Sequence, residues 1–208
     1  SMAQLVQALD ANFEGHDRLR LLLQNRTPFY GNDDECADQI MQTVFELYFG
    51  LIDGRPNTKG GSYHINLLPT TCHVYFGAVM GASAEGRLAG RPLSEGISPV
   101  QGHDRNGPTA VLLSASKMDH LRTGGTLLNQ KFAPALLKEE SGLELLTNLV
   151  RSYFKLDGHH IQFNVVDAET LRKACVQPQQ YRDLIVRVAG YSDYFCDLSR
   201  QLQDEIIT

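Results

Sequence analysis

Cysteine and histidine side chains are the first candidates for metal binding or acid–base chemistry in this chain. The four cysteines are widely separated, and no two lie at the short spacings typical of zinc or iron–sulfur ligands: Cys36, Cys72, Cys175 and Cys196. His64 and His73 could act as ligands or acid–base groups, but neither has a carboxylate or second histidine at ligand spacing. We therefore predict no metal site in this chain and expect structural roles for both histidines.

A glycine near the end of an apolar run is the other residue that could have a special role. Residues 184–188 are mostly branched and apolar, which predicts a short buried strand, and the strand stops at Gly190. Glycine at such a place usually marks a tight bend or the close approach of another backbone. From this pattern alone, Gly190 is a turn residue.

The neighbours of this glycine suggest a different role. Residues 187–192 resemble the radical-bearing loop of the glycyl radical enzymes, the superfamily of pyruvate formate-lyase. The run consists of Arg187, Val188, Ala189, Gly190, Tyr191 and Ser192. In that family an activating enzyme removes a hydrogen atom from the glycine Cα, and the unpaired electron spreads over the flanking amides. The resemblance implies that Gly190 carries the radical, because a Cβ would crowd a planar Cα and restrict its dihedrals. It also implies a buried loop, which would keep oxygen away.

Other segments resemble the same family, in the family's order: 84–90, 98–99, 106–109, 125–129 and 160–165. Asp193 departs from the family, which usually has a small residue at that place. Ala189 and Ser192 resemble the eliminase branch, which includes the glycerol and choline enzymes. Residues 68–77, 155–160 and 191–198 look most like the hydroxyproline dehydratases and the isethionate-type sulfonate lyases, and we favour the former.

The resemblance also implies a fold and a reaction. Family members are several times longer and form an α/β barrel of two five-stranded halves, so this chain would be the C-terminal portion of a ten-stranded barrel, preceded by helices. The glycyl radical makes a thiyl radical on a cysteine of an upstream loop, which has no counterpart here, and the thiyl takes a hydrogen atom from the substrate. We expect the radical-bearing part of a lyase, inactive without the missing N-terminal part.

The implied activating enzyme is a separate radical protein that uses S-adenosylmethionine and an iron–sulfur cluster, so we expect no cofactor bound by this chain itself. Surfaces that the rest of the barrel would cover predict a homo-oligomer. Two alternatives stay open. One is a stand-alone spare part that supplies a glycyl radical to another enzyme, and the other is a non-catalytic scaffold that would tolerate alanine at Gly190.

Composition limits the remaining possibilities. The net charge of -5 gives no basic patch, so we expect no nucleic-acid partner. The sequence shows no apolar run near the ~20 residues that a membrane span needs and no signal peptide, so we expect a cytoplasmic protein. We predict a vector scar at residues 1–2, a helical segment at 3–56, and the glycyl radical domain at 57–208 with its radical loop at 187–192.

The elements that would position the glycine follow from periodicity and capping residues. Apolar residues at helical spacing predict a helix with a stripe of Ile40, Val44, Leu47 and Leu51. Further along, strands are predicted within 63–77, 126–132 and 159–166, helices at 109–118, 143–158, 167–175 and 200–207, and an irregular stretch at 81–107. Strands that alternate with helices long enough to cross over predict a parallel α/β arrangement.

Overall fold

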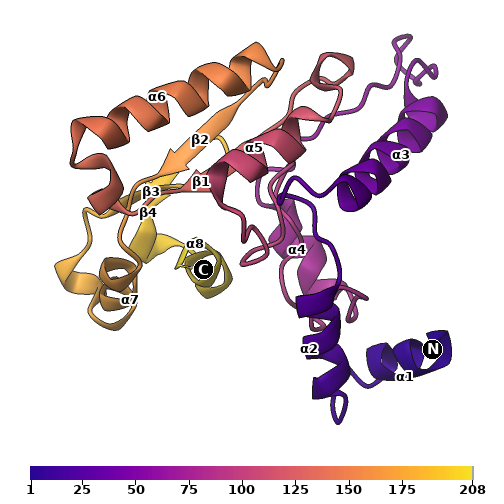
Figure 1. The fold of residues 1–208 in the computed structure, drawn as a ribbon, viewed down its shortest axis with the longest axis horizontal. Helices are drawn as coiled ribbons and strands as arrows, with labels where there is room; N and C mark the ends of the chain where they lie inside the picture. The colour runs from indigo at the N-terminus through magenta and orange to yellow at the C-terminus, as the bar shows by residue number, and fades with distance from the viewer. Residues whose placement is uncertain (208) are drawn as a thin grey trace. The chain divides into compact units, whose positions relative to one another are not determined.

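The structure is a computed structural model that describes residues 1–207. The chain forms two compact units, one made of Ser1–Pro28 and Thr71–Leu93, the other of Phe29–Thr70 and the residues from Ser94 onward. Figure 1 shows the elements in chain order. The expected boundary near residue 56 stays a prediction.

The smaller unit contains three helices and an irregular segment, 80–93. The helices are α1 (Met2–Asp10), α2 (Asp17–Arg26) and α4 (Cys72–Val79). Arg87 is buried within the irregular segment, and its guanidinium donates hydrogen bonds to the carbonyls of Gly81 at 2.5 Å and Arg91 at 2.8 Å. One cation therefore satisfies carbonyls from both ends of the segment, which fixes its path without regular secondary structure.

The larger unit holds the remaining elements. Its helices are α3 (Glu35–Ile52), α5 (Gly107–Ser116), α6 (Glu140–Lys155), α7 (Ala168–Val176) and α8 (Arg200–Ile207). Its strands are β1 (Leu128–Lys131), β2 (Ile161–Asn164), β3 (Ile185–Arg187) and β4 (Ser192–Tyr194). Single turns of 3-10 helix lie at His120–Arg122, Pro134–Leu137, Pro178–Gln180 and Phe195–Asp197.

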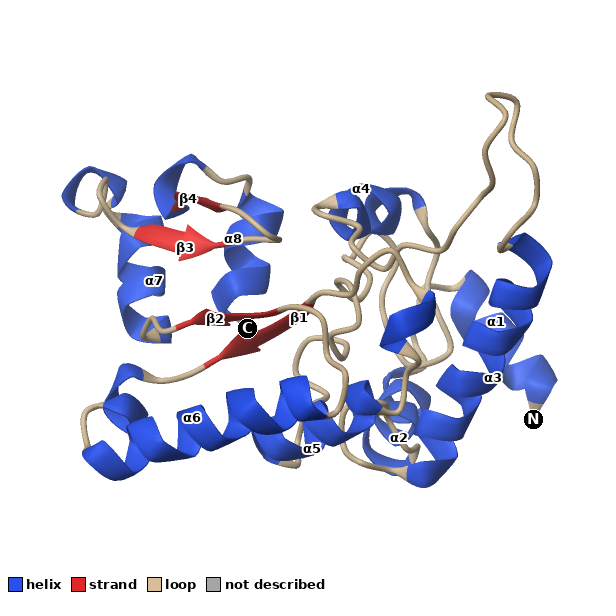
Figure 2. Ribbon diagram, turned by 90° about the horizontal axis from the view of Figure 1, so that it is seen from above, coloured by secondary structure: helices blue, strands red, loops and turns tan. Residues whose placement is uncertain are grey.

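Strands β1 and β2 pair in parallel, with Leu128 opposite Ile161 and Asn129 opposite Gln162. The connection between them runs through α6, as parallel neighbours require a long crossover. Figure 2 shows this pair between α5 and α6 on one side and the β3–β4 hairpin with α7 and α8 on the other. The predicted parallel α/β arrangement is confirmed for these two strands.

The two faces of the β1–β2 pair have different partners. Leu128 and Ile161 pack against a core that includes Val111 of α5 and Tyr153 of α6. Leu127 faces the second core, which also contains Leu171, Val186, Val188, Phe195 and Ile206. Because successive side chains of a strand point to opposite faces, Asn129 and Gln162 share the second face with Leu127.

Strands β3 and β4 form an antiparallel hairpin, with Ile185 opposite Tyr194 and Arg187 opposite Ser192. The expected strand at 184–188 is therefore present, but it pairs with its own continuation. Within residues 1–207, no backbone ladder joins this hairpin to β1 or β2. The predicted burial holds for Val186 and fails for Ile185, which is 55% exposed. In a hairpin with one covered face, alternate residues point outward.

The segment 63–77 differs from the expected strand. Its second half is the start of α4, and residues 63–71 make only a single bridge, between Leu67 and Thr126, among the described residues. A short apolar run is compatible with either a strand or a buried helical turn, and periodicity does not decide between them. Pro69 separates the two halves, so the run never formed one continuous element.

Candidate functional site: the Gly190 hairpin

Gly190 lies at the tip of the β3–β4 hairpin. Its φ is +81°, and the turn is closed by a hydrogen bond from the Val188 N–H to the Tyr191 carbonyl at 2.9 Å. A Cβ added at Gly190 would meet no heavy atom within 4 Å. The hairpin thus favours glycine here through its left-handed backbone and not through lack of space.

The expected burial of the loop is found only in part. Val188 and Ala189 are buried in the second core, at 7% and 4% exposure, whereas Gly190 and Tyr191 are exposed. The apolar side chains before the glycine anchor the loop, and the tip carries no comparable anchor. Among the described residues Gly190 is therefore exposed, and its Cα can be reached from outside the larger unit, while burial of the whole loop stays a prediction.

One buried side chain holds the glycine. The Gly190 N–H donates to Oε1 of Gln162 at 2.9 Å, and Nε2 of the same carboxamide donates to the Val188 carbonyl at 2.8 Å. Gln162 is only 5% exposed. A single amide therefore satisfies two backbone groups on either side of Ala189, groups that the hairpin ladder leaves unpaired.

Two further amides hold the strand that leads into the loop. Asn164 donates from Nδ2 to the Arg187 carbonyl at 2.7 Å and accepts from the Arg187 N–H at 2.8 Å. Asn129 donates to the Val188 carbonyl at 3.4 Å. We call Asn129, Gln162 and Asn164 the amide clamp. Its side chains replace the missing backbone ladder between β2 and β3.

Sequence reasoning missed the amide clamp, although a signal was present. Gln162 and Asn164 occupy alternate positions of the otherwise apolar run 161–166, and Asn129 lies on the neighbouring strand. Amides at period two in a buried strand must find partners, because an unpaired buried amide costs about 1–3 kcal/mol. That pattern indicates a backbone lying against this face of the sheet.

A buried carboxylate supports the clamp from behind. Glu95 is 3% exposed and accepts hydrogen bonds from Asn129 Nδ2 and from the Ser98 hydroxyl. Ser98 also accepts from the Asn129 N–H at 2.9 Å. Gly96 has a φ of +56°, and a Cβ there would lie 2.4 Å from the Leu127 carbonyl oxygen, so only glycine lets this segment approach β1 so closely.

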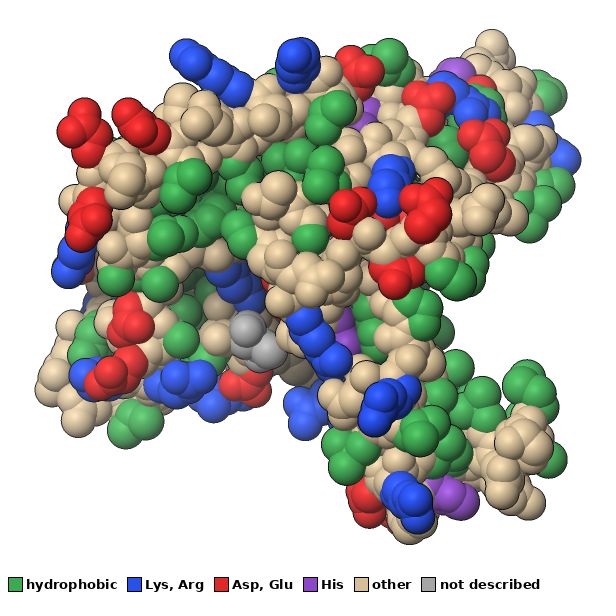
Figure 3. Space-filling view, viewed as in Figure 1, with side chains coloured by type: hydrophobic (Ala, Val, Ile, Leu, Met, Phe, Trp, Pro, Cys, Tyr) green, Lys and Arg blue, Asp and Glu red, His purple; other side chains and the backbone are tan. Residues whose placement is uncertain are grey.

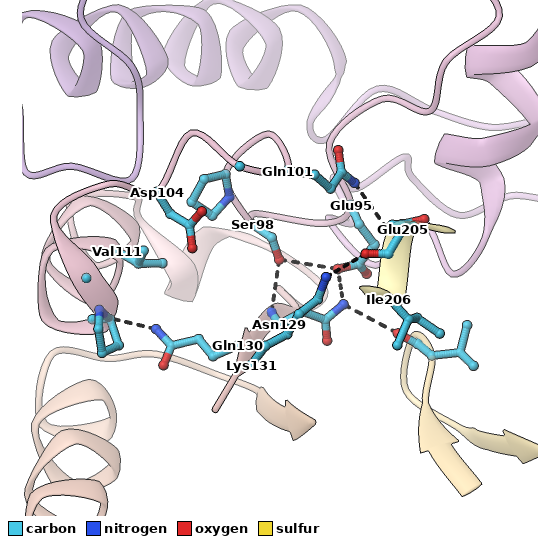
Figure 4. A pocket seen from close by; sticks show the side chains of 15 residues that line it. Glu95, Ser98, Gln101, Asp104, Val111, Asn129, Gln130, Lys131, Glu205 and Ile206 are labelled. Atoms are coloured by element: carbon cyan, nitrogen blue, oxygen red, sulfur yellow. Dashed lines mark hydrogen bonds between the residues drawn. The ribbon is translucent and has the colours of Figure 1, made fainter. Parts of the chain in front are cut away.

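A cavity of about 300 Å³ opens beside this network (Figure 4). Asn129 of the clamp and Val188 of the loop line it. Charged side chains also line it, namely Glu95 of the segment 94–108, Lys131 of β1 and Glu205 of α8. Figure 4 shows Ser98, Glu95 and Asn129 converging at its inner wall. Val188 therefore belongs to the second core and also lines this cavity.

The remaining predicted loop residues lie on the hairpin itself. A guanidinium nitrogen of Arg187 donates to the Ser192 hydroxyl at 3.1 Å, across the last pair of the ladder. Tyr191 is 40% exposed and follows the glycine at the tip. The six residues from Arg187 to Ser192 thus form the end of one hairpin, in which Val188 and Ala189 are buried.

His64 has partners that sequence spacing did not reveal. Its Nδ1 lies 2.9 Å from Asp53 Oδ1, and its Nε2 lies 3.0 Å from the Ser62 hydroxyl. The order Ser–His–Asp is that of hydrolase triads, but such triads act in desolvated sites, and the His64 side chain is 65% exposed. We interpret the trio as a surface hydrogen-bond chain.

Cys196 is the cysteine nearest the hairpin in sequence. Its Sγ lies 3.3 Å from the Tyr181 carbonyl oxygen, and burial raises the pKa of the thiol, with Asp197 adding to the effect. The thiol is therefore protonated at neutral pH. Within residues 1–207 no three histidine, cysteine or acidic side chains are arranged to hold a metal ion. None of the helices in that range combines the length and apolar character needed to cross a bilayer.

Two family models match the chain. The one described as glycine radical matches residues 93–196, and the one described as pyruvate formate lyase-like matches residues 1–77. The chain is 60% identical to trans-4-hydroxy-L-proline dehydratase of Clostridioides difficile, over 99% of this chain and 26% of the relative. It is 43% identical to isethionate sulfite-lyase of Bilophila wadsworthia, over 100% of this chain and 25% of the relative.

A solved structure has the same fold. The crystal structure of hydroxyproline dehydratase from Clostridioides difficile, with trans-4-hydroxy-L-proline bound, superimposes with a TM-score of 0.97 at 60% identity. The match covers 100% of this chain and 26% of that one. The chain thus spans about a quarter of the length of the relatives it matches.

Proposed function

Because this chain belongs to the glycyl radical family, with its glycine radical region at residues 93–196, we propose that Gly190 carries the radical. In this proposal an activating enzyme that uses S-adenosylmethionine and an iron–sulfur cluster breaks one Cα–H bond of Gly190 homolytically. A radical formed by the activating enzyme takes the hydrogen atom, and the unpaired electron stays on the Gly190 backbone.

The radical then serves a longer protein. A cysteine outside this chain gives its S–H hydrogen atom to the Gly190 Cα, which restores glycine and leaves a thiyl radical. The thiyl takes a hydrogen atom from the substrate, and the substrate radical loses water or another leaving group. We place this cycle in an anaerobic cytoplasm, where the four free cysteines stay reduced.

One observation supports the proposal most directly. Gly190 has a left-handed φ at an accessible hairpin tip, and its N–H is bonded to a buried carboxamide. The open space around the Cα leaves a C–H bond within reach of a second protein, while the clamp holds the flanking peptide. Arg187, Val188, Ala189, Tyr191 and Ser192 complete the loop in the proposed role, with Val188 and Ala189 as its anchor.

Substrate choice is proposed from similarity. The 60% identity to trans-4-hydroxy-L-proline dehydratase favours radical dehydration of a hydroxylated small molecule such as a hydroxyproline. The 43% identity to isethionate sulfite-lyase favours cleavage of a carbon–sulfur bond as the second candidate. Glycerol- or choline-type elimination and a stand-alone spare part are the remaining alternatives.

The proposal is tested by activating the chain under anaerobic conditions. The purified chain is mixed with a radical activating enzyme, S-adenosylmethionine and a reductant, and electron paramagnetic resonance is recorded. We expect a doublet radical signal that is absent in Gly190→Ala. No signal from the wild-type chain with any activating enzyme of the family would favour the scaffold alternative.

A second mixture tests the reaction. The activated chain is combined with the N-terminal three quarters of a hydroxyproline dehydratase, and turnover of trans-4-hydroxy-L-proline is compared with that of isethionate. Turnover of the former alone supports the dehydratase, and turnover of the latter supports the sulfonate lyase. A radical that persists without turnover of either substrate supports the spare-part alternative.

A further inference from the structure

We propose that Gln162 is a positioning residue for the radical, because its carboxamide fixes the peptide unit between Ala189 and Gly190. The inference rests on the proposed role of Gly190. Gln162 touches the nitrogen over which the unpaired electron spreads, through the hydrogen bond from the Gly190 N–H to Oε1 at 2.9 Å. It holds the preceding turn of the loop through Nε2 and the Val188 carbonyl, at 2.8 Å.

Glycine is the residue that most needs such a constraint. Without a Cβ its backbone samples more conformations than any other residue, and Gly190 lies at an exposed tip with no packing around its Cα. The hydrogen bond to Gln162 is the contact that ties its N–H to the rigid sheet. A radical at this position would otherwise sample many orientations of its flanking amide.

The side chain is itself held firmly. Gln162 is 5% exposed, and it belongs to β2, whose backbone pairs with β1. Its neighbour on the same face, Asn164, binds both backbone groups of Arg187. The loop is therefore fixed at its entry by Asn164 and at the glycine by Gln162, which places the two constraints three residues apart.

Only a carboxamide of this length suits both contacts. Glutamine offers one donor and one acceptor on the same group, whereas glutamate at neutral pH cannot donate and methionine can do neither. Asparagine keeps the chemistry but is one methylene shorter, so it cannot reach both partners from β2. A neutral group also avoids a buried charge beside the radical.

The test compares Gln162→Met with Gln130→Met in the 208-residue chain. Gln130 is a matched control because it is 7% exposed, lies on the paired strand β1, and donates its own Nε2 to a backbone carbonyl, that of Pro108 at 3.1 Å. It lies on the opposite face of the sheet and does not bind the loop. Thermal melting shows whether each variant folds, and Gln162→Asn replaces Gln162→Met if the latter does not.

Two readouts separate this inference from the proposed function. In the unactivated chain, hydrogen exchange of the Gly190 amide should be roughly tenfold faster in the Gln162 variant, as expected for loss of one buried hydrogen bond. In the activated chain, the hyperfine coupling of the radical to the Gly190 N–H should change, and the radical should decay faster. Gln130→Met should match the wild type in both.

The outcomes are distinct. Wild-type-like amide exchange in the Gln162 variant overturns the positioning role, whether or not a radical forms. An unchanged hyperfine coupling and lifetime in that variant overturns it as well, since a purely structural residue would lower only the melting temperature. Faster exchange in the Gln162 variant, together with no radical in the activated wild-type chain, contradicts the proposed function and leaves the contact of Gln162 with the glycine in place.

Discussion

At the scale of single residues, Gly190 has a left-handed backbone, which disfavours a side chain, although the space around its Cα would admit one. Its φ is +81°, and no heavy atom lies within 4 Å of a built Cβ. Gly190→Ala should therefore fold, with a loss of about 1 kcal/mol in the free energy of unfolding from the left-handed backbone. It should give no radical signal after activation.

Gly15→Ala is the matched control for this substitution. Gly15 also has a left-handed φ, +71°, and open space around its Cα, but it lies in the smaller unit. Urea unfolding should show a similar loss of stability for both variants, and only Gly15→Ala should retain the radical. Equal radical yield in the two variants would contradict the assignment of Gly190.

Asn164 is the second residue whose effect is specific. It makes two hydrogen bonds to the backbone of Arg187, and its removal leaves both groups unpaired at the edge of β3. Asn164→Ala should lower the free energy of unfolding by about 2–3 kcal/mol. Asn148→Ala, at an exposed position of α6, should change it by less than about 0.5 kcal/mol. Equal effects in a denaturant titration would show that the Arg187 contacts contribute little.

At the scale of elements, a lysine joins α3 to the end of α5. Lys117 Nζ lies 2.7 Å from Asp38 Oδ2, 2.9 Å from Asp33 and 3.3 Å from Glu35. Asp38 has no exposed surface, so loss of the cation leaves a buried carboxylate without its counter-charge. Lys117→Met should destabilise the chain by about 3–5 kcal/mol, measured by urea unfolding. Lys117→Arg should recover much of that loss, and a neutral effect of the methionine would indicate that α3 and α5 are held by other contacts.

The start of α7 gives a prediction about pH. Asp167 accepts hydrogen bonds from the backbone N–H and the hydroxyl of Thr170, and the backbone bond is the main cause that lowers the pKa of this carboxyl. Because the pKa of Asp167 is lower in the folded state than in the unfolded state, its ionised carboxylate stabilises the folded chain at pH values above the unfolded-state pKa. This stabilisation is lost as the pH falls through the folded-state pKa. The stability difference between wild type and Asp167→Asn should therefore shrink between neutral pH and about pH 3. A constant difference in urea midpoints would contradict the cap.

Several elements could be predicted from sequence because their signals are local. Asp167 marked the start of α7 and Ser199 the start of α8, because the Asp167 carboxylate and the Ser199 hydroxyl accept hydrogen bonds from the first turn of each helix. The segment 63–77 was mispredicted because its apolar residues suit a strand or a helix equally. The amide clamp was missed for a different reason: amides at alternate positions of a strand do not reveal which backbone they bind, and the partners of Gln162 lie more than 20 residues away.

At the scale of the whole molecule, large apolar side chains are exposed on several helices. On α3 they form a stripe of Ile40, Val44, Leu47 and Leu51, each at least half exposed. Figure 3 shows others over α5 and α6, where Leu113, Leu143 and Phe154 are exposed. Contiguous apolar surface of this kind marks an interface with another protein surface. In relatives about four times longer, the rest of the polypeptide is the natural candidate to cover it.

The chain alone should therefore self-associate, with the α3 stripe as one contact. Light scattering should show a mass that rises with concentration, because association removes exposed apolar surface from water. The double variant Val44→Glu and Leu47→Glu should shift the chain toward monomer, since two charges would be buried at the contact. Val176→Glu is the control: Val176 is 78% exposed at the end of α7, so its replacement should leave the association unchanged. A wild-type chain that stays monomeric at every concentration would contradict the view that the exposed apolar side chains of these helices form an interface.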